Sequence, residues 1–220
     1  PVDKDMKPVR PDLIWMDRRA EEETEWVKAN ISTEKLTEIT GDDVVDPYYG
    51  YTKILWIKNH EPENWKKIHM FLPPSNYAIY QLTGAVCIDH TAAGNLGGLY
   101  DINTHTWSKE LLNAMGIPES MMPEPIVDST TIVGHITNEA AADLGLKAGT
   151  PVVSGGVDVG AANVGMGVFE PGRYVAAIGS SMNAALVSKT PIKGKGLIVW
   201  PYPYKSKDLV YNFSGSATAG

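Results

Sequence analysis

The sequence predicts an α/β protein with mixed sheets, and three observations support this prediction. Apolar strand-like runs alternate with helix-like segments early in the chain, and strand-like runs crowd together from Arg173 onward. The 220 residues are 43% apolar and 20% charged, which is an ordinary globular composition. A chain of this length buries roughly 70% of its unfolded surface, so we expect a substantial core.

The helices are predicted from their apolar spacing and from the residues at their ends. Acids fill the first half of the segment from Arg18 to Asn30 and Lys28 lies near its end, as the helix dipole favours. Thr137 is an N-cap candidate, and glycines follow several of these segments. In chain order, the predicted helices are 18–30, 33–40 before Gly41, 53–59, a helix opened by Pro73 and Pro74 and ended by Gly84, 107–116, 137–145 and 158–167.

Strands are predicted where short apolar or β-prone runs lie between turn residues. In chain order they are Leu13–Trp15, 69–73, 129–136, 151–156, a hairpin over 173–188 with its turn near Gly179, and a strand pair over 196–204 and 208–214. Residues 46–53 and 85–102 are predicted as loop-rich connections, because proline, glycine and small residues interrupt them.

Composition excludes several classes of protein. The formal net charge is −7 and no run of Lys and Arg is long enough to follow a phosphate backbone, so we expect no nucleic-acid partner. No apolar run approaches the ~18 residues that span a bilayer, and no signal peptide is visible, so no membrane partner is expected. Cys87 is the single cysteine, which rules out an intrachain disulfide and suits the reducing cytoplasm.

The segment "PVVSGGVDVG" (151–160) places one carboxylate, Asp158, where a strand passes through Gly155 and Gly156 into a helix. Free backbone N–H groups at such a junction bind anions. Asp158 therefore has two interpretations: it caps the helix, or it acts as a general base beside a bound phosphate, kept ionised by the helix dipole. The glycines match neither G-x-G-x-x-G nor a P-loop, so a dinucleotide or Walker site is not indicated.

A second glycine turn follows in "VAAIGSSMN", where Gly179, Ser180 and Ser181 lie between two β-prone runs. Its backbone N–H groups and hydroxyls could hold a nucleotide phosphate, although a plain β-turn is the commoner use of such residues. His90 and His105 are interpreted as structural, because no second ligand stands at metal spacing to either, and no metal site is predicted.

The stretch "TPVVSGGVDVGAANVGMGVFEPGRYVAAIGSSMNAALV" resembles the core signature of the FGGY carbohydrate kinases. In that family a G-x-x-D turn carries the catalytic aspartate and a later G-T-S turn contacts ATP phosphate. Upstream, "LIWMDRRAEEE" is similar to the W-x-D-x-R segment, and "DPYYGYTKILWIKNHEPENW" is similar to the family's helix with K-x-x-W. "FLPPSNYAIYQLTGAVCIDHTAAGNLGGLYDINTHTW" resembles the stretch around L-T-G and D-x-S-x-A. The resemblance covers nearly all of the chain in the family's order.

The resemblance assigns a role to each matching position. Asp158 aligns with the general base. Trp15 and Tyr48 fall where glycerol kinases place a tryptophan and a tyrosine against the substrate, with a core or rim role as the alternative for both. Gly179, Ser180 and Ser181 fall on the ATP-phosphate turn, where Ser180 replaces threonine and keeps the hydroxyl.

Several family features are missing from the sequence. These are the N-terminal D-x-G-T/S phosphate turn, a following sugar-contact turn and the C-terminal adenosine-binding turn. The resemblance therefore implies a segment of a longer kinase. Residues 1–174 would be most of the N-terminal domain, and residues 175–220 the opening strands of the C-terminal domain, in a ribonuclease-H-like (actin-like ATPase) fold whose mixed sheet is flanked by helices. On its own the chain is expected to be inactive, and a homodimer is compatible with its exposed strand edges.

For the parent protein the resemblance implies transfer of a phosphoryl group from ATP, with Mg²⁺, to a sugar or polyol hydroxyl in the cytoplasm. A ketose such as xylulose is the first candidate, with glycerol, ribulose, rhamnulose, fuculose and gluconate open. Two alternatives remain: a non-catalytic sugar-binding or regulatory relative, and an actin-like ATPase that needs no sugar.

Overall fold

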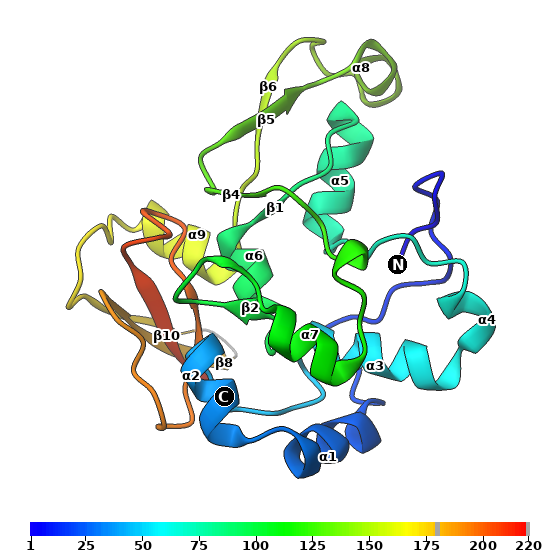
Figure 1. The fold of residues 1–220 in the computed structure, drawn as a ribbon. Helices are drawn as coiled ribbons and strands as arrows, with labels where there is room; N and C mark the ends of the chain where they lie inside the picture. The colour runs from blue at the N-terminus through cyan, green and yellow to red at the C-terminus, as the bar shows by residue number, and fades with distance from the viewer. Residues whose placement is uncertain (179–180, 219–220) are drawn as a thin grey trace.

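The computed structural model describes residues 1–178 and 181–218. Helices dominate the first half of the chain and alternate with very short strands (Figure 1). In chain order the elements up to residue 121 are α1 (Glu21–Asn30), α2 (Thr33–Thr40), α3 (Gly50–His60), α4 (Pro62–Trp65), α5 (Pro74–Thr83), β1 (Ile88–Asp89), α6 (His90–Asn95), β2 (Tyr100–Asp101), β3 (Thr106–Trp107), α7 (Lys109–Met115) and a 3₁₀ turn (Glu119–Met121).

The second half carries the longer strands. Its elements are β4 (Ile126–Val127), β5 (Ile132–His135), α8 (Asn138–Leu144), β6 (Pro151–Val153), α9 (Asp158–Gly165), β7 (Tyr174–Ile178), β8 (Ser181–Ser188), β9 (Ile198–Pro201) and β10 (Val210–Thr218). β1 and β4 pair in parallel, whereas β2–β3, β5–β6 and the β7–β8–β10–β9 sheet are antiparallel. Both strand directions occur, which confirms the predicted mixed α/β class.

The helix signals in the sequence were reliable. Ser32, Ser108 and Thr137 cap α2, α7 and α8 through their side-chain oxygens. Glycines in the left-handed conformation end α2, α5, α7 and α8, at the four positions that the sequence indicated: Gly41, Gly84, Gly116 and Gly145. These residues satisfy terminal backbone groups that the helices cannot pair internally.

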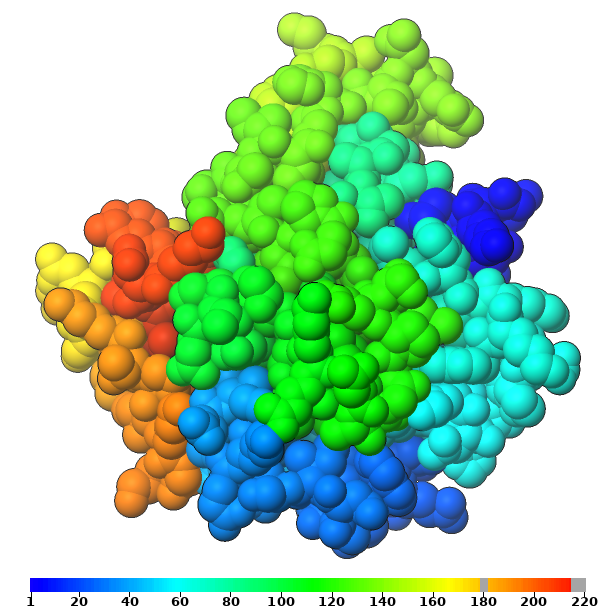
Figure 2. Space-filling model, in the orientation of Figure 1, coloured from blue at the N-terminus to red at the C-terminus, as the bar shows by residue number. Residues whose placement is uncertain are grey.

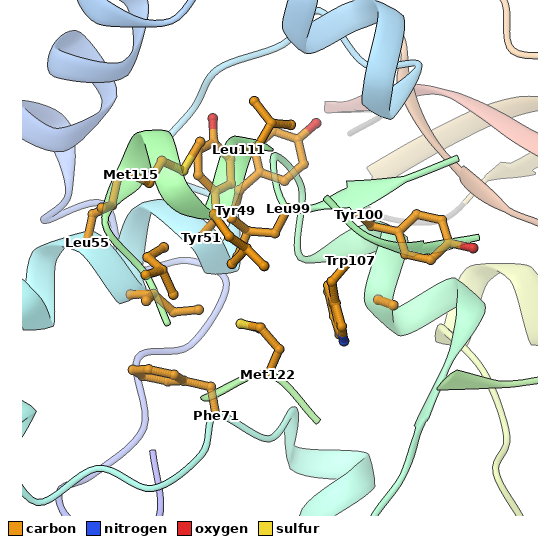
Figure 3. Close-up of a cluster of buried hydrophobic side chains, with 14 of the residues drawn as sticks. Tyr49, Tyr51, Leu55, Phe71, Leu99, Tyr100, Trp107, Leu111, Met115 and Met122 are labelled. Atoms are coloured by element: carbon orange, nitrogen blue, oxygen red, sulfur yellow. The ribbon is translucent and has the colours of Figure 1, made fainter. Parts of the chain in front are cut away.

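The main core lies where α1, α2, α3 and α7 converge (Figure 1). Figure 3 shows large side chains from α3, α7 and the intervening loops pointing into one space, among them Tyr51, Leu111 and Trp107. Trp107 is buried, and its indole N–H donates to the Pro123 carbonyl at 3.1 Å. Each fully buried side chain of this kind contributes about 1.5–3 kcal/mol through area removed from water.

A second core joins the late sheet to α9. Trp200, Tyr202 and Tyr211 pack on the inner face of the β8–β10–β9 strands. Val157, the residue before α9, and valines of α9 itself, such as Val159, pack against this cluster. The helix that begins with Asp158 is therefore seated on the late sheet, and not only on the earlier part of the chain.

Three of the predicted elements were wrong. Leu13–Trp15 is a loop and turn, not a strand end: Leu13 is buried, but Ile14 and Trp15 are exposed. Residues 69–73 form no strand, and Met70 makes only an isolated bridge to Val2. The connection over 85–102 contains β1, α6 and β2, because buried Asp89 caps a helix of small residues that the sequence pattern does not announce.

Candidate functional site

Asp158 is the first residue of α9, and its carboxylate is exposed to solvent. The N-cap of α9 is Val157, which provides no side-chain cap, and Asp158 Oδ1 accepts the N–H of Val159, at 2.7 Å. Asp158 therefore does not cap the helix through the N-cap position, the alternative considered from the sequence. Its carboxylate keeps lone pairs free to accept a proton.

A cavity of about 260 Å³ adjoins the start of α9. Val157, next to Asp158, forms part of its wall together with Trp15 and Tyr48. Polar residues of the wall include Asp12, Lys53, Ser75 and Asn95, and apolar side chains from α3, α6 and the 71–74 segment complete it. A concave, mostly apolar space with a few polar groups is typical of a small-molecule site.

Trp15 and Tyr48, far apart in the sequence, meet at the rim of this cavity. Their ring centroids are 6.3 Å apart and the rings meet edge to face. Trp15 keeps 66% of its surface exposed, whereas Tyr48 is half-buried. Both residues line the cavity, and a role for either in binding substrate stays a prediction.

Three contacts hold Tyr48 in place. Its hydroxyl donates to Asn95 Oδ1 at 3.2 Å, and its N–H donates to Asp46 Oδ1 at 2.8 Å. Buried Lys53 donates to the carbonyl oxygens of Pro47 and Tyr48 at 2.5 and 2.7 Å. Burial lowers the pKa of Lys53 to about 8, against the opposing charges of Asp17 and Asp46. Lys53 acts here as a structural anchor of the loop.

The turn that carries Trp15 is tied to the same loop. Arg18 forms two hydrogen bonds to Asp46, at 3.0 and 3.1 Å, and Arg19 pairs with Asp17. The Arg19 side chain lowers the pKa of Asp17 by hydrogen bonding. These exposed pairs contribute little to stability, but the Arg18–Asp46 fork links the Trp15 turn to the segment that leads into Tyr48.

The charge of Asp158 acts on two tyrosines, Tyr48 in the cavity wall and Tyr211 on the late sheet. Burial raises the pKa of the Tyr48 hydroxyl, and the negative charge of Asp158 raises it further. Burial also raises the pKa of Tyr211 on β10, again with a contribution from Asp158. Both phenols therefore stay protonated at neutral pH; the Tyr48 hydroxyl donates to Asn95, and the Tyr211 hydroxyl accepts from Asn163.

The proposed phosphate turn is only partly visible. Gly179 and Ser180 lie outside the described residues, and Ser181 is the first residue of β8. The flanking strands form the predicted antiparallel hairpin, with Ile178 opposite Met182. A role for Gly179, Ser180 and Ser181 in phosphate binding stays a prediction.

The two histidines considered from the sequence, buried His90 and half-buried His105, belong to one hydrogen-bond chain. His90 Nδ1 lies 2.8 Å from the Tyr100 hydroxyl, which is 3.2 Å from His105 Nδ1. Within residues 1–178 and 181–218, no group of three or more His, Cys, Asp or Glu side chains is placed to hold a metal ion. In the same ranges, no helix is both long and apolar enough to cross a bilayer.

Sequence reasoning missed Asn95 and Lys53 as parts of the site. Asn95 is the one long polar side chain near the end of the small-residue run "TAAGNLGG", and Lys53 is the one cation in "GYTKILWI". A single polar residue inside an apolar or small-residue segment is the signal that could have identified both.

Comparison with known proteins gives a consistent result. The model of the N-terminal domain of the FGGY family of carbohydrate kinases matches residues 1–165. The chain is 32% identical over 183 residues to the xylulose kinase of Staphylococcus xylosus, covering 82% of this chain and 37% of that protein. It is 31% identical over 225 residues to the xylulose kinase of Bacillus subtilis (strain 168), covering 100% of this chain and 43% of that protein.

A solved structure, xylulose kinase from Rhodospirillum rubrum, superposes with a TM-score of 0.90 at 27% identity, over 99% of this chain and 43% of that one. The chain thus has the α/β fold of the actin-like sugar kinases, as predicted. It spans about two fifths of the length of these relatives.

Proposed function

The chain belongs to the FGGY family of carbohydrate kinases, and we propose that the protein containing it transfers the γ-phosphoryl group of ATP to a hydroxyl of a sugar or polyol. A ketose is the first candidate, and xylulose in particular, because the relatives described above are xylulose kinases. The observation that supports the proposal is that Asp158, an exposed carboxylate that is not the N-cap of α9, directly follows Val157 in the wall of the cavity that Trp15 and Tyr48 also line.

In the proposed reaction the substrate hydroxyl oxygen attacks the γ-phosphorus, the bond to the β–γ bridging oxygen breaks, and ADP leaves. Asp158 takes the hydroxyl proton as the new P–O bond forms. Trp15 and Tyr48 hold the sugar so that this hydroxyl faces Asp158. The chain contributes mainly positioning, because the nucleophile is the substrate itself.

The nucleotide's phosphates are proposed to lie against the turn formed by Gly179, Ser180 and Ser181. We propose that Mg²⁺ arrives with ATP, since this ion is usually held by substrate phosphates, waters and one or two carboxylates. The described side chains provide no cluster that would form a metal cage of their own.

We also propose that the border between two domains falls near Val175, so that 1–174 and 175–220 belong to different domains. Two observations support this border. The family model of the N-terminal domain ends at residue 165, and β7, β8, β9 and β10 form one sheet with its own aromatic core. A homodimer, a cytoplasmic location and the lack of a nucleic-acid or membrane partner stay predictions.

The test is an ADP-release assay of the full-length protein with ATP·Mg²⁺ against a panel of ketoses and polyols, led by xylulose. We expect ADP release that depends on one ketose. ADP release that is equal with and without sugar would favour an ATPase instead. Sugar binding without any ADP release would favour a regulatory relative and would contradict the proposal.

A further inference from the structure

Helix α6 connects the two halves of the candidate site. At its end, Asn95 Oδ1 accepts the hydroxyl of Tyr48 at the cavity rim. At its start, the hydroxyl oxygen of Thr91 accepts the N–H of Val157 at 2.8 Å. Val157 is the N-cap of α9 and directly precedes Asp158. One six-residue helix therefore contacts both the sugar side and the base side of the site.

The Thr91 hydroxyl is oriented by a buried carboxylate. Asp89 Oδ1 accepts the N–H groups of Thr91 and Ala92 at 2.9 and 3.0 Å, and also accepts the Thr91 hydroxyl hydrogen. Asp89 and Thr91 are at most 1% exposed. Because the single hydroxyl hydrogen of Thr91 points to Asp89, its lone pairs remain free to accept the Val157 N–H.

The backbone approaches closely at this contact. A Cβ atom on Gly156 would lie 3.2 Å from Thr91 Oγ1 and 3.1 Å from Ser129 Oγ. Gly155 N–H also donates to the Ser129 carbonyl, at 2.9 Å. Gly155 and Gly156 thus let the junction between β6 and α9 lie against Thr91. Val157, the N-cap of α9, has no side chain that could accept the N–H groups at the start of that helix.

We infer that Thr91, oriented by Asp89, is a positioning residue that fixes the start of α9 and so places the Asp158 carboxylate for proton transfer. Thr91 does not touch the reacting atoms; it acts through the Val157 N–H. The inference rests on the proposed function for the role of Asp158, whereas the hydrogen bond itself can be tested without turnover.

The first test compares Thr91→Val with Thr91→Ser in the full-length protein. Valine keeps the volume and removes the acceptor, so we expect kcat to fall by about 10- to 100-fold, the cost of a misplacement of about 1 Å, with a much smaller change in the KM for sugar. Serine keeps the hydroxyl, and we expect it to stay within about threefold of the wild type. Thr24→Val is the matched control, because Thr24 is also buried but bonds to the Ala20 carbonyl within the α1 region.

A double-mutant cycle separates positioning from general destabilisation. If Thr91 acts through Asp158, Thr91→Val should change kcat by less than about twofold in an Asp158→Asn background. If the fold-loss of kcat in the double variant equals the product of the losses in the two single variants, the inference is overturned.

Amide exchange of Val157 in the full-length protein tests the contact independently of activity. We expect slow exchange in the wild type and Thr91→Ser, and at least about 10-fold faster exchange in Thr91→Val. Equal rates would overturn the inference even if sugar phosphorylation is confirmed. If the wild type shows slow exchange at Val157 but releases no ADP in response to sugar, the proposed function is overturned instead. The role of Thr91 in positioning Asp158 for proton transfer is then overturned with it. If Thr91→Val does not fold, Asp89→Asn replaces it, and an unchanged kcat and exchange rate would be the contradicting result.

Discussion

At the scale of single residues, the proposed function makes Asp158 the group on which proton transfer depends. Asp158→Asn keeps the size of the side chain but removes the proton acceptor. We expect turnover of the full-length protein to fall by roughly 10²- to 10⁴-fold, the usual effect of losing a general base, while sugar binding changes much less. Steady-state kinetics with the preferred ketose measures this, and a variant with more than half of the wild-type rate would remove Asp158 from the mechanism.

Under the proposed function, Trp15 and Tyr48 in the cavity wall contact the sugar. Trp15→Ala removes a rim wall that is largely exposed to solvent, and Tyr48→Phe removes the hydroxyl that bonds Asn95. Both changes should raise the KM for sugar and leave the KM for ATP nearly unchanged, because they remove ground-state contacts away from the nucleotide. Larger effects on ATP than on sugar would show that these residues were placed on the wrong side.

Buried His90 makes stability sensitive to acid. Burial lowers its pKa to about 4 from 6.5, so the unfolded chain binds a proton between these pH values while the folded chain does not. The free energy of unfolding should therefore fall as pH drops from 6.5 to 4, and His90→Gln should flatten this dependence. Asp42 acts in the opposite direction, since burial raises its pKa to about 6, so each variant is compared with the wild type at every pH.

Urea unfolding at pH 7 and pH 5 measures the effect of His90. His69→Gln, at an exposed position, serves as the control. Equal pH dependence in the wild type and His90→Gln would contradict the prediction. Half-buried His105, which shares Tyr100 with His90, also has a pKa lowered by burial and contributes to the slope that remains.

At the scale of elements, the packing around Gly94 on α6 predicts that alanine destabilises the protein there, the opposite of what helix propensity alone predicts. Alanine is usually better than glycine inside a helix by about 1 kcal/mol. A Cβ on Gly94, however, would lie 2.6 Å from Pro201 Cδ and 2.8 Å from Trp200 Cβ, where α6 meets β9. We expect Gly94→Ala to lower the free energy of unfolding by about 1–3 kcal/mol through overpacking.

Gly165, the last residue of α9, provides the matched comparison. A Cβ there meets no atom within 4 Å, so Gly165→Ala should be neutral or stabilising by up to about 1 kcal/mol. Urea unfolding of Gly94→Ala, Gly165→Ala and the wild type measures the free energy of unfolding of each. A stabilised Gly94→Ala variant would mean that α6 and β9 pack less closely than the structure has them.

The elements also mark how far sequence alone could go. Helices with local signals, such as α2 with Ser32 and Gly41 at its ends, were predicted closely because caps and stops are written in neighbouring residues. Helix α6 was not: its cap Asp89 is the preceding residue, but its run of small residues carries no apolar period, and its contact to Val157 joins residues far apart in the sequence. The same limit applies to the candidate site: Asp158 was singled out at the glycine junction, and family resemblance gave it, Trp15 and Tyr48 their predicted roles. Asn95 and Lys53 were added from their contacts to Tyr48.

At the scale of the whole molecule, one lobe stands apart. β5, α8 and β6 project from the body next to the end of α5 (Figures 1 and 2). The buried core of this lobe is small, formed by Ile136, Ala140 and Ala141 with Leu82 and Val152 packed against them. Regions with few buried apolar contacts open at lower free energy than a main core. Amides of the lobe should therefore exchange faster than those of α3 and α7.

The junction between this lobe and α9 limits how far such opening reaches. Ser154 N–H donates to the Thr131 carbonyl at 3.0 Å, Gly155 N–H to the Ser129 carbonyl at 2.9 Å, and Val157 N–H to Thr91. These bonds tie the chain down between β6 and Asp158. The lobe can therefore loosen while the carboxylate keeps its place.

Ile136→Ala tests this separation. Removing a buried isoleucine costs about 2–5 kcal/mol, which exceeds what a core of this size is expected to supply, so amides of β5, β6 and α8 should exchange at least about 10-fold faster. Because the bonds from Ser154 to Val157 lie between the lobe and Asp158, kcat and the KM for sugar of the full-length protein should stay within about twofold of the wild type. Hydrogen exchange and steady-state kinetics on the same variant measure both quantities. A loosened lobe accompanied by a large loss of kcat would show that the lobe, and not α6, sets the position of Asp158.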